Sequence, residues 1–440
     1  MTIKRAPLEA WIAQKIRVEK QSLTRDQVEE YQLQELRKTI RLAHGRSPFY
    51  RKLLNGIAET EITALSDLQG FPFTTAEDIM EQSLQFLCVS QDEIGRVVTL
   101  DTSGTTGRSK RISFTPSDQE LTIDFFRHGM STLVEAGDSV MILLPCEREG
   151  SVGDLLADAL ARLGVRPVRQ GVVRNISGTL IIMRAEDVNS LVGIPVQVLA
   201  LARYADAEGI PIRVKSALLS TDYVPAVIVR ELERIWNSRV FEHYGMTEMG
   251  LGGGVECEAH EGYHLREADL YFEIVDTAGN PVPKGQEGEV VFTTLTRQGM
   301  PLMRYRTGDI SRFLTEPCKC GTSLRRLDRI TGRKNSLISI GENQHFSISD
   351  LDENIFAVSG VIDFTASVDN SRKATKLTIA AVTIDQPYED IESALSVALD
   401  AVYSIREARR DGKLKMSVKT MRCDGTLMPP TGKRLIKELN

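Results

Sequence analysis

The sequence is 440 residues long, roughly two to three times the length of a typical domain, so one large and one small domain are expected. With 42% hydrophobic and 26% charged residues, the composition is that of a soluble globular protein, and the net charge of −6 offers no basic field for nucleic acid or an anionic membrane. No stretch approaches the roughly 20 apolar residues of a membrane-spanning helix, and six cysteines are too few for a disulfide scaffold in so long a chain. We therefore expect a cytoplasmic protein whose partners include neither nucleic acid nor membrane.

The first half of the chain predicts helices followed by alternating strands and helices. Apolar residues recur at helical spacing from Leu8 to Leu54, and Thr24 and Gln27 form a capping box that marks a helix start. From Ile94 onward, short apolar runs expected to be buried strands alternate with helical stretches. The expected strands are RVVTL, SVMILLP, TLIIM, VQVLAL, VKSALLS and SRVFEHYG, and helices are expected at Asp154–Leu163 and Val224–Trp236. This alternation predicts an α/β fold with mostly parallel sheets flanked by helices.

The pattern changes in the second half of the chain. Between Tyr271 and Arg312, two strands joined by turn residues predict an antiparallel hairpin or small barrel. After Gly332 a small α+β unit of about one hundred residues is expected. Its predicted elements are a helix at Ile348–Val358, strands at Val361–Val368 and Lys376–Thr383, a long helix at Tyr388–Arg410 and a strand at Lys415–Arg422.

The stretch Leu100–Thr115 places small and hydroxyl-bearing residues between two apolar segments. Hydroxyl groups donate to phosphate, glycines let backbone N–H groups approach an anion, and Lys110 adds positive charge. The spacing GTTGRSK differs from the P-loop of NTPases, which needs Gly-Lys-Ser/Thr after four free positions. An exposed strand–turn–strand hairpin is the alternative. The residues expected to hold phosphate are Ser103, Gly104, Thr105, Thr106, Gly107 and Lys110.

Four later segments accompany this loop: EHYGMTE (Glu242–Glu248), RYRTGD (Arg304–Asp309), ITGRKNSLI (Ile330–Ile338) and PPTGKR (Pro429–Arg434). In this order, and with SGTTGRSK, they resemble the motifs of the adenylate-forming superfamily, the acyl- and aryl-coenzyme A ligases and their relatives. The compact length and the segments SPFYRKLL and FPFTTAEDI are most similar to the phenylacetate–coenzyme A ligase branch. The resemblance implies an N-terminal adenylate- and acyl-binding domain over residues 1–333 and a small mobile α+β domain over residues 334–440.

EHYGMTE follows an apolar run, so it is expected in the loop that leaves a strand, at the sheet edge where ligands bind in open α/β folds. The resemblance implies that this loop, with Gly245 and Met246, cups the adenylate, that Tyr244 stacks on adenine and that Thr247 reaches the phosphate. It also implies that Glu248 holds Mg²⁺, because a carboxylate attracts a triphosphate only through a hard cation. Without the resemblance, Glu248 is a surface glutamate after a core tyrosine.

Two further groups are assigned to the nucleotide. Asp309 suits a ribose because two vicinal hydroxyls can donate to one carboxylate, although a salt-bridged turn aspartate is the alternative. The resemblance implies that Arg333 reaches the ribose and phosphate side. Thr221, Asp222 and Tyr223 lie between a strand and a helix, where the family presents groups to adenine and the acyl chain. An ordinary connection capped by an aspartate explains these three residues equally well.

Lys433 follows a Pro-Pro-Thr-Gly loop near the C-terminus and by itself is an ordinary surface lysine. The resemblance implies that it swings over the site during adenylation, where charge builds up on the transferring phosphoryl group. With Glu248 and Thr247, it completes the expected catalytic set. The family's hinge residue, two places after the motif arginine, is usually Asp or Lys. Here it is Asn335, which tolerates unusual backbone angles but departs from the pattern.

Cysteine and histidine residues group in two segments, ECEAHEGYH and EPCKCG. Three thiolates and one imidazole can form a tetrahedral zinc site, and some relatives in the branch carry similar sets. The expected ligands are Cys257, His264, Cys318 and Cys320. His260 could replace His264, and independent buried cysteines are the alternative. A closed four-ligand site has no open position, so this zinc would be structural.

These expectations combine in a two-step acid–thiol ligase. A carboxylate attacks the α-phosphate of MgATP to give acyl-adenylate and pyrophosphate; the small domain then re-orients, and coenzyme A displaces AMP. The expected cofactors are ATP, Mg²⁺, coenzyme A and structural Zn²⁺. The acid is left open with an aromatic acid favoured, and a homodimer is also left open. Two alternatives are an adenylating enzyme with an amine, carrier protein or cofactor hydroxyl as acceptor, and a non-catalytic adenylate-binding scaffold.

Overall fold

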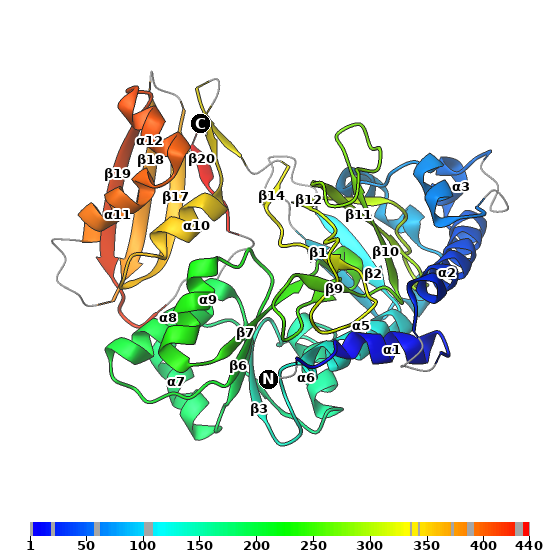
Figure 1. Cartoon of the computed structure of the whole chain (residues 1–440), viewed down its shortest axis with the longest axis horizontal. Coiled ribbons are helices and arrows are strands. Elements are labelled where there is room, and N and C mark those ends of the chain that lie inside the picture. The colour runs from blue at the N-terminus through cyan, green and yellow to red at the C-terminus, as the bar shows by residue number, and fades with distance from the viewer. Residues whose placement is uncertain are drawn as a thin grey trace. The chain divides into compact units, whose positions relative to one another are not determined.

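A computed structural model describes residues 3–18, 23–56, 62–100, 109–334, 337–341, 344–370, 374–384, 391–426 and 434–439 (Figure 1). The chain divides into two compact units. Unit 1 contains Met1–Thr132, Glu149–Leu163 and His243–Thr331, and unit 2 contains Leu133–Arg148, Gly164–Glu242 and Gly332–Asn440. The predicted domain boundary after residue 333, and the mobility of residues 334–440, remain predictions.

Several helices of unit 1 start at a side-chain cap, whereas the first, α1, has none. In α2 the Thr24 hydroxyl accepts from the amide of Gln27, and the Gln27 side chain accepts from the amide of Thr24, as the sequence predicts. The helices of unit 1 are α1 (Pro7–Lys15), α2 (Arg25–Arg46), α3 (Pro48–Leu53), η3 (Leu65–Gly70), α4 (Ala76–Gln82), η4 (Ser83–Phe86), η5 (Gln91–Glu93), α5 (Pro116–Met130), α6 (Val152–Ala161) and η6 (Thr247–Met249).

The strands of unit 1 are antiparallel. Strands β1 (Arg96–Leu100) and β2 (Lys110–Phe114) pair antiparallel on either side of residues 101–108. This pairing agrees with both the phosphate-loop and the hairpin interpretation. The predicted antiparallel region forms the order β10 (Leu270–Val275), β11 (Gly288–Thr294) and β12 (Tyr305–Ser311). Short strands β8 (Gly254–Val255), β9 (Tyr263–Leu265) and β13 (Arg326–Leu327) extend from the end of β7 (Arg239–Tyr244). A core that includes Phe114, Tyr244, Phe292 and Tyr305 joins these elements.

Unit 2 contains the predicted parallel sheet. Its order is β7, β6 (Ser216–Leu219), β5 (Ser190–Gly193), β3 (Ser139–Leu143) and β4 (Arg166–Arg169), with every pair parallel. Strands β3, β5 and β6 are buried along their whole length, which explains why they are continuous apolar runs. Helices α7 (Ile176–Ala185), α8 (Pro195–Ala207) and α9 (Ala226–Trp236) connect and cover the strands (Figure 1).

Two predicted strands of this region are helices. The run TLIIM lies in α7 and VQVLAL lies in α8, whereas the true strands are β4 and β5. Helix α8 is buried on most of its faces, so its apolar run has no helical period, and such a run cannot be distinguished from a buried strand. Asn175 caps α7 through the amide of Gly178, and Pro195 starts α8 at a first-turn position.

The C-terminal part of unit 2 is the predicted α+β element set. Its sheet has the order β19 (Leu414–Arg422), β18 (Thr375–Thr383), β17 (Val361–Asp369) and β20 (Lys437–Leu439). The other elements are β14 (Gly332–Arg333), β15 (Ile338–Ile340), β16 (Gln344–Phe346), α10 (Ile348–Ile355), α11 (Ile391–Asp400) and α12 (Tyr403–Arg410). The single long helix predicted at Tyr388–Arg410 is wrong, because α11 and α12 are separate. Val402 between them has an extended backbone (φ −74°, ψ 110°), which interrupts a helical pattern that continues in the sequence.

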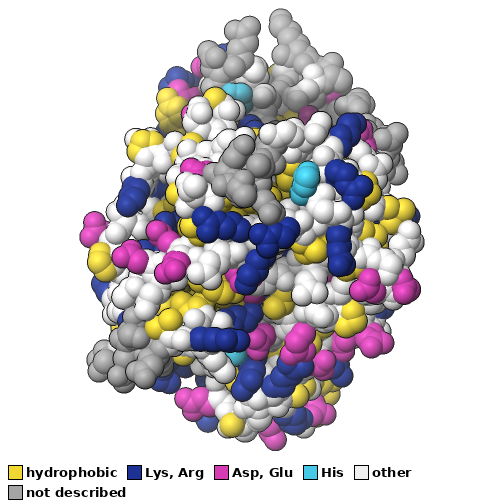
Figure 2. Space-filling view, turned by 90° about the vertical axis from the view of Figure 1, so that its right-hand side faces the viewer, with side chains coloured by type: hydrophobic (Ala, Val, Ile, Leu, Met, Phe, Trp, Pro, Cys, Tyr) yellow, Lys and Arg dark blue, Asp and Glu magenta, His cyan; other side chains and the backbone are white. Residues whose placement is uncertain are grey.

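In the part of the chain that the structure describes, no helix is both long enough and apolar enough to span a bilayer. Figure 2 shows one face of the molecule, where acidic and basic side chains both occur. Charges of both signs on one face give a weaker net field than a cluster of one sign.

Candidate active site

Glu248 lies in a tight turn that follows strand β7. The strand ends at Tyr244, and residues 245–248 form the connection that the sequence predicts at a strand end. A side chain at Gly245 would come within 2.7 Å of the Leu251 carbonyl oxygen and 2.9 Å of Gly252 Cα, so the close backbone approach requires glycine. Gly250, with φ +73°, then reverses the chain in the left-handed region. As a result Glu248 is only 2% exposed.

The Glu248 carboxylate is held by two side chains. The Lys110 ammonium, at the start of β2, donates to Glu248 Oε1, and the Tyr305 hydroxyl of β12 donates to the same oxygen at 3.1 Å. Lys110 Nζ is also 3.2 Å from the Tyr305 hydroxyl oxygen. Although burial opposes ionisation, the Lys110 charge and these hydrogen bonds hold the pKa of Glu248 below its usual value. The three residues therefore form a buried, charged cluster at the exit of the predicted phosphate loop.

Arg297 fixes the backbone of the same turn. Its Nη1 donates to the carbonyl oxygen of Glu248 at 2.7 Å, and its guanidinium lies 4.3 Å from the ring centre of Phe114 at the end of β2. Burial lowers the pKa of Arg297 to about 10, so it stays protonated at neutral pH. Among the described residues its Nε and Nη2 have no hydrogen-bond partner. Burying two unpaired N–H groups costs stability, so Arg297 contributes more to positioning the Glu248 turn than to stabilising the fold.

Tyr244 and Asp309 are brought together in unit 1. The Tyr244 hydroxyl donates to Asp309 Oδ2 at 3.0 Å, and the Tyr244 ring lies against that of Tyr263. Asp309 lies within β12, and the arginines near it in sequence have other partners. Arg304 pairs with Glu273 and Arg306 with Glu289. Both arginines are thus committed to the β10–β12 sheet, and the predicted contacts of Tyr244 with adenine and of Asp309 with ribose stay predictions.

The other predicted nucleotide residues belong to unit 2 or lie outside the described residues. Thr221 has φ +75°, a strained value for a β-branched residue, in the connection between β6 and α9. Asp222 and Tyr223 form hydrogen bonds with residues 434 and 353, and Arg333 lies in β14. Outside the described residues are Ser103, Gly104, Thr105, Thr106, Gly107, Asn335 and Lys433.

The cluster around Glu248 fits a divalent cation. A carboxylate oxygen is the ligand type that Mg²⁺ prefers, and here Glu248 Oε1 already forms an ion pair with the ammonium of Lys110. Because Lys110 can pair instead with a phosphate oxygen, arrival of a metal-bound triphosphate would give both groups a new partner of opposite charge. The chemistry of Glu248 thus suits a Mg²⁺ ion, and its assignment to Mg²⁺ stays a prediction.

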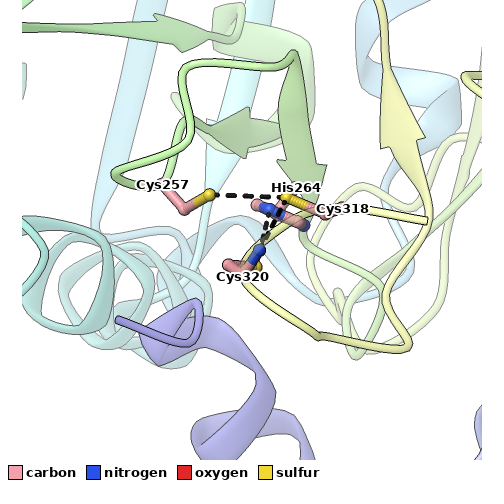
Figure 3. Close-up of side chains that lie close together, drawn as sticks. All are labelled: Cys257, His264, Cys318 and Cys320. Carbon is pink, nitrogen blue, oxygen red and sulfur yellow. Dashed lines mark hydrogen bonds between the residues drawn. The ribbon is translucent and has the colours of Figure 1, made fainter. Parts of the chain in front are cut away.

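The structure brings Cys257, His264, Cys318 and Cys320 together (Figure 3). Cys257 follows β8, His264 lies in β9, and the other two cysteines come from the loop after β12. Their ligand atoms all lie within 4.8 Å of one another, and all four residues are buried. Cys257 Sγ and Cys318 Sγ are 3.7 Å apart, and Cys320 Sγ is 3.6 Å from His264 Nε2. Ideal tetrahedral zinc places two sulfurs ~3.8 Å apart and sulfur and nitrogen ~3.6 Å apart.

The alternative ligand His260 has a different neighbour. Its Nδ1 lies 3.3 Å from a carboxylate oxygen of Glu256, and the cluster contains His264 instead. The hydrogen bond between Cys257 and Cys320 lowers the pKa of Cys320 and raises the pKa of Cys257. One thiolate is therefore favoured even without metal, which is the form of cysteine that binds zinc.

Residues 62–296 match the model of a family described as AMP-binding enzyme. The chain belongs to the AMP-binding enzyme family. This AMP-binding enzyme is 29% identical to a phenylacetate–coenzyme A ligase of Thermus thermophilus, over 73% of its own chain and 74% of the relative. It is 28% identical to that of Escherichia coli, over 72% and 73% of the two chains. The predicted superfamily and branch are thereby confirmed.

A solved structure of 2-hydroxyisobutyryl-CoA ligase, in the postadenylation state with R3-HIB-AMP, shares the fold of this AMP-binding enzyme. The TM-score is 0.78 at 18% identity, and the match covers 95% of this chain and 90% of that one. The predicted fold class is confirmed by this likeness and by the mixed α/β architecture.

Two residues that contact Glu248 were not predicted. Tyr305 lies inside the quoted motif RYRTGD, and Arg297 lies in the strand connection just before it. The motif itself was the available signal for Tyr305, since an aromatic residue with a hydroxyl can reach a buried carboxylate. Nothing local marks Arg297 in this AMP-binding enzyme, because its partner is a main-chain carbonyl 49 residues away.

Proposed function

We propose that this chain is an AMP-forming ligase that joins a carboxylic acid to coenzyme A through an acyl-adenylate. The observation that carries the proposal is the buried ion pair of Lys110 and Glu248, the residues that the resemblance assigns to phosphate and to Mg²⁺. An AMP-binding enzyme without chemistry would have no need to bury a carboxylate against a phosphate-loop lysine. Similarity to phenylacetate–coenzyme A ligases supports coenzyme A as the acceptor.

In the first step, an oxygen of the acid attacks the α-phosphorus of ATP, the bond to the bridging oxygen breaks, and pyrophosphate leaves. The Lys110 ammonium leaves its ion pair with Glu248 and pairs with a phosphate oxygen. Tyr305 keeps the Glu248 carboxylate in place through its hydrogen bond. When bound, Mg²⁺ would supply positive charge against the phosphates. In the second step, the sulfur of coenzyme A attacks the acyl carbon and gives up its proton to water, and the bond between the acyl carbon and the AMP oxygen breaks, so that AMP leaves.

The acid itself is proposed to be aromatic, because the relatives with similar sequences are phenylacetate ligases. A screen of aromatic, aliphatic and keto acids, with pyrophosphate release and thioester formation measured separately, tests this. Release with an aromatic acid, and thioester only when coenzyme A is added, is the expected result. Pyrophosphate release without any thioester would indicate another acceptor. No release with any acid would leave the scaffold alternative.

We further propose that Cys257, His264, Cys318 and Cys320 hold one structural Zn²⁺. The support is the agreement between their sulfur and nitrogen separations and tetrahedral zinc. Four protein ligands leave no position for substrate. The ion would join the loop after β8 to the loop after β12, the strand that carries Tyr305 and Asp309.

A further inference from the structure

Glu353 of α10 caps a helix that lies more than one hundred residues earlier in the chain. Its Oε1 accepts from the Tyr223 hydroxyl at 2.8 Å and from the amide of Ala226 at 2.7 Å, and its Oε2 accepts from the amide of Val227 at 3.2 Å. Ala226 is the first residue of α9, and the N-cap residue, Pro225, offers no side-chain cap. The first amides of a helix have no partner within it, and its N-terminus favours negative charge.

Arg434 makes a second connection within unit 2. Its main-chain amide donates to Asp222 Oδ2 at 3.0 Å, in the same connection between β6 and α9. Its guanidinium pairs with Asp352 at 3.1 Å and Asp363 at 2.9 Å and lies 4.4 Å from the ring centre of Phe364. The side chain of Arg434 is therefore bound to residues of the 334–440 segment, whereas its amide is bound to the earlier part of the unit.

A re-orientation of residues 334–440 would keep some of these contacts and break others. If residues 334–440 turn between the two half-reactions, the ion pairs of Arg434 with Asp352 and Asp363 move with the segment. The hydrogen bonds of Glu353 with Tyr223 and α9, and of the Arg434 amide with Asp222, must break. These bonds exist in one arrangement only. They hold Arg434, which directly follows Lys433 in the sequence, at the Thr221–Tyr223 connection. The resemblance assigns this connection to the nucleotide, so under the proposed function we take this arrangement as the adenylating one.

We infer that Glu353 is a positioning residue that latches the 334–440 segment for adenylate formation, through the Tyr223 hydroxyl and the N-terminus of α9. This role rests on the proposed function. Because the bonds stabilise one of two conformations, removing them lowers the population of the adenylating arrangement and leaves the thioester-forming one unhindered. Adenylation should therefore slow, and thioester formation from supplied acyl-adenylate should not.

The test compares Glu353→Ala, Glu353→Gln and the matched control Asn354→Ala. Asn354 is half-buried on the same helix, and its side-chain amide donates to the Asp350 carbonyl oxygen of that helix. Acid-dependent exchange of pyrophosphate into ATP reports adenylation, with phenylacetate or whichever acid the screen selects. Thioester formation is followed from the corresponding acyl-adenylate and coenzyme A.

We expect Glu353→Ala to slow exchange about tenfold, with thioester formation equal to or faster than that of the wild type. Glu353→Gln, which keeps one acceptor oxygen, should recover part of the exchange, and Asn354→Ala should match the wild type. Faster hydrogen–deuterium exchange at Ala226 and Val227 in Glu353→Ala would show that the cap is lost.

Equal loss of both half-reactions, or no loss of either in a folded Glu353→Ala with an exposed α9 N-terminus, would overturn the latch while leaving the proposed function standing. If Glu353→Ala does not fold, the same comparison is decided by Glu353→Gln. A wild-type protein with neither half-reaction would overturn the proposed function and this role with it.

Discussion

Glu248 is a buried carboxylate whose ion-pair partner, the ammonium of Lys110, can be exchanged for another cation. A buried charge without a partner costs several kcal/mol, so Lys110 stabilises Glu248 when no other positive charge is present. The two hydrogen bonds to Oε1 fix the orientation of the carboxylate before any ligand arrives. Under the proposed function, this ion pair serves binding more than stability, because each member would gain a second partner, a phosphate for Lys110 and the metal for Glu248.

We expect Glu248→Gln to lower Mg²⁺-dependent pyrophosphate release by about 100-fold, because the neutral amide no longer attracts the cation. AMP binding, measured by calorimetry, should change much less, since it needs no metal. Tyr305→Phe removes one hydrogen bond to the same carboxylate and should act in the same direction, by about tenfold. Glu261→Gln, which removes the partner of the exposed Lys319, is the control. If turnover and AMP binding fall by the same factor, Glu248 is structural.

Asp352 predicts a pH dependence of stability. Burial raises the pKa of Asp352 to about 7 despite the charge of Arg434, and Asp222 and Asp363 raise it further. A carboxyl group whose pKa is higher in the folded state binds more protons there between about pH 4 and 7. Its contribution to stability is therefore complete below its unfolded pKa and is lost as the pH rises through 7.

In urea unfolding at pH 5 to 8, the free energy of unfolding of the wild type minus that of Asp352→Asn should fall by about 1 kcal/mol per pH unit up to pH 7 and then level off. The asparagine cannot titrate, whereas the neighbouring charges are kept. Asp411→Asn, at an exposed position in the same segment, should show no such trend. A difference that is constant with pH would mean that Asp352 is ionised throughout.

At the scale of elements, the cysteine cluster joins loops that have little secondary structure of their own. Strands β8 and β13 have two residues each, so their backbone hydrogen bonds alone are a weak constraint. Ala6 and Ile3, at the start of the chain, pack against the cysteines, and the amide of Lys4 donates to Glu258 at 2.9 Å. A metal ion at the cluster would therefore stabilise both the loops and the N-terminal segment.

Purified protein should contain about one equivalent of zinc by elemental analysis, as expected of a closed site. Cys318→Ser should lower the zinc content and the melting temperature, and should expose the N-terminal segment to proteases. Cys146→Ser, outside the cluster, is the control. Metal-free wild-type protein with an unchanged melting temperature would remove the zinc proposal. Zinc lost in His260→Ala but kept in His264→Ala would mean that the ligand set is wrong.

At the scale of the whole molecule, one segment of the chain carries both the predicted catalytic lysine and the surface that packs on α8. Buried Arg203 of α8 donates to the carbonyl oxygens of Phe356 at 2.8 Å and Val358 at 3.1 Å, just after α10. Like the bonds of Glu353, these contacts belong to a single arrangement of unit 2. If the proposed reaction re-orients residues 334–440, these contacts break in every cycle, so they have to be strong enough to position the segment yet reversible.

Lys433→Ala should abolish adenylation, with a loss of about 100-fold or more, because the lysine neutralises charge that develops in the first transition state. Thioester formation from supplied acyl-adenylate should survive, since under the proposed function that step uses another arrangement of residues 334–440. The two half-reactions are measured separately in the same preparation, with Lys437→Ala of β20 as the control. Equal loss of both half-reactions in Lys433→Ala would contradict the assignment.

Local patterns were sufficient for some elements of the fold and insufficient for others. The Thr24–Gln27 cap and the antiparallel β10–β12 region follow from neighbouring residues, so they were predicted. Helices α7 and α8 were predicted as strands because an element buried on most sides has no periodicity to read. The break at Val402 was missed for a similar reason, since the two helices that it separates continue one apolar pattern, and packing on the sheet decides where the chain turns.

The sequence by itself determined the family and nominated several candidate site residues, among them Lys110 and Glu248, because motifs such as EHYGMTE encode their turns and reactive groups in a few adjacent positions. Only the tertiary structure decided which groups meet. Lys110 and Glu248 are 138 residues apart, and Cys257 and Cys318 are 61 apart. Their pairing depends on how strands and loops pack. The same holds for Glu353, an unremarked helical residue in the sequence, whose capping of α9 depends on long-range packing within unit 2.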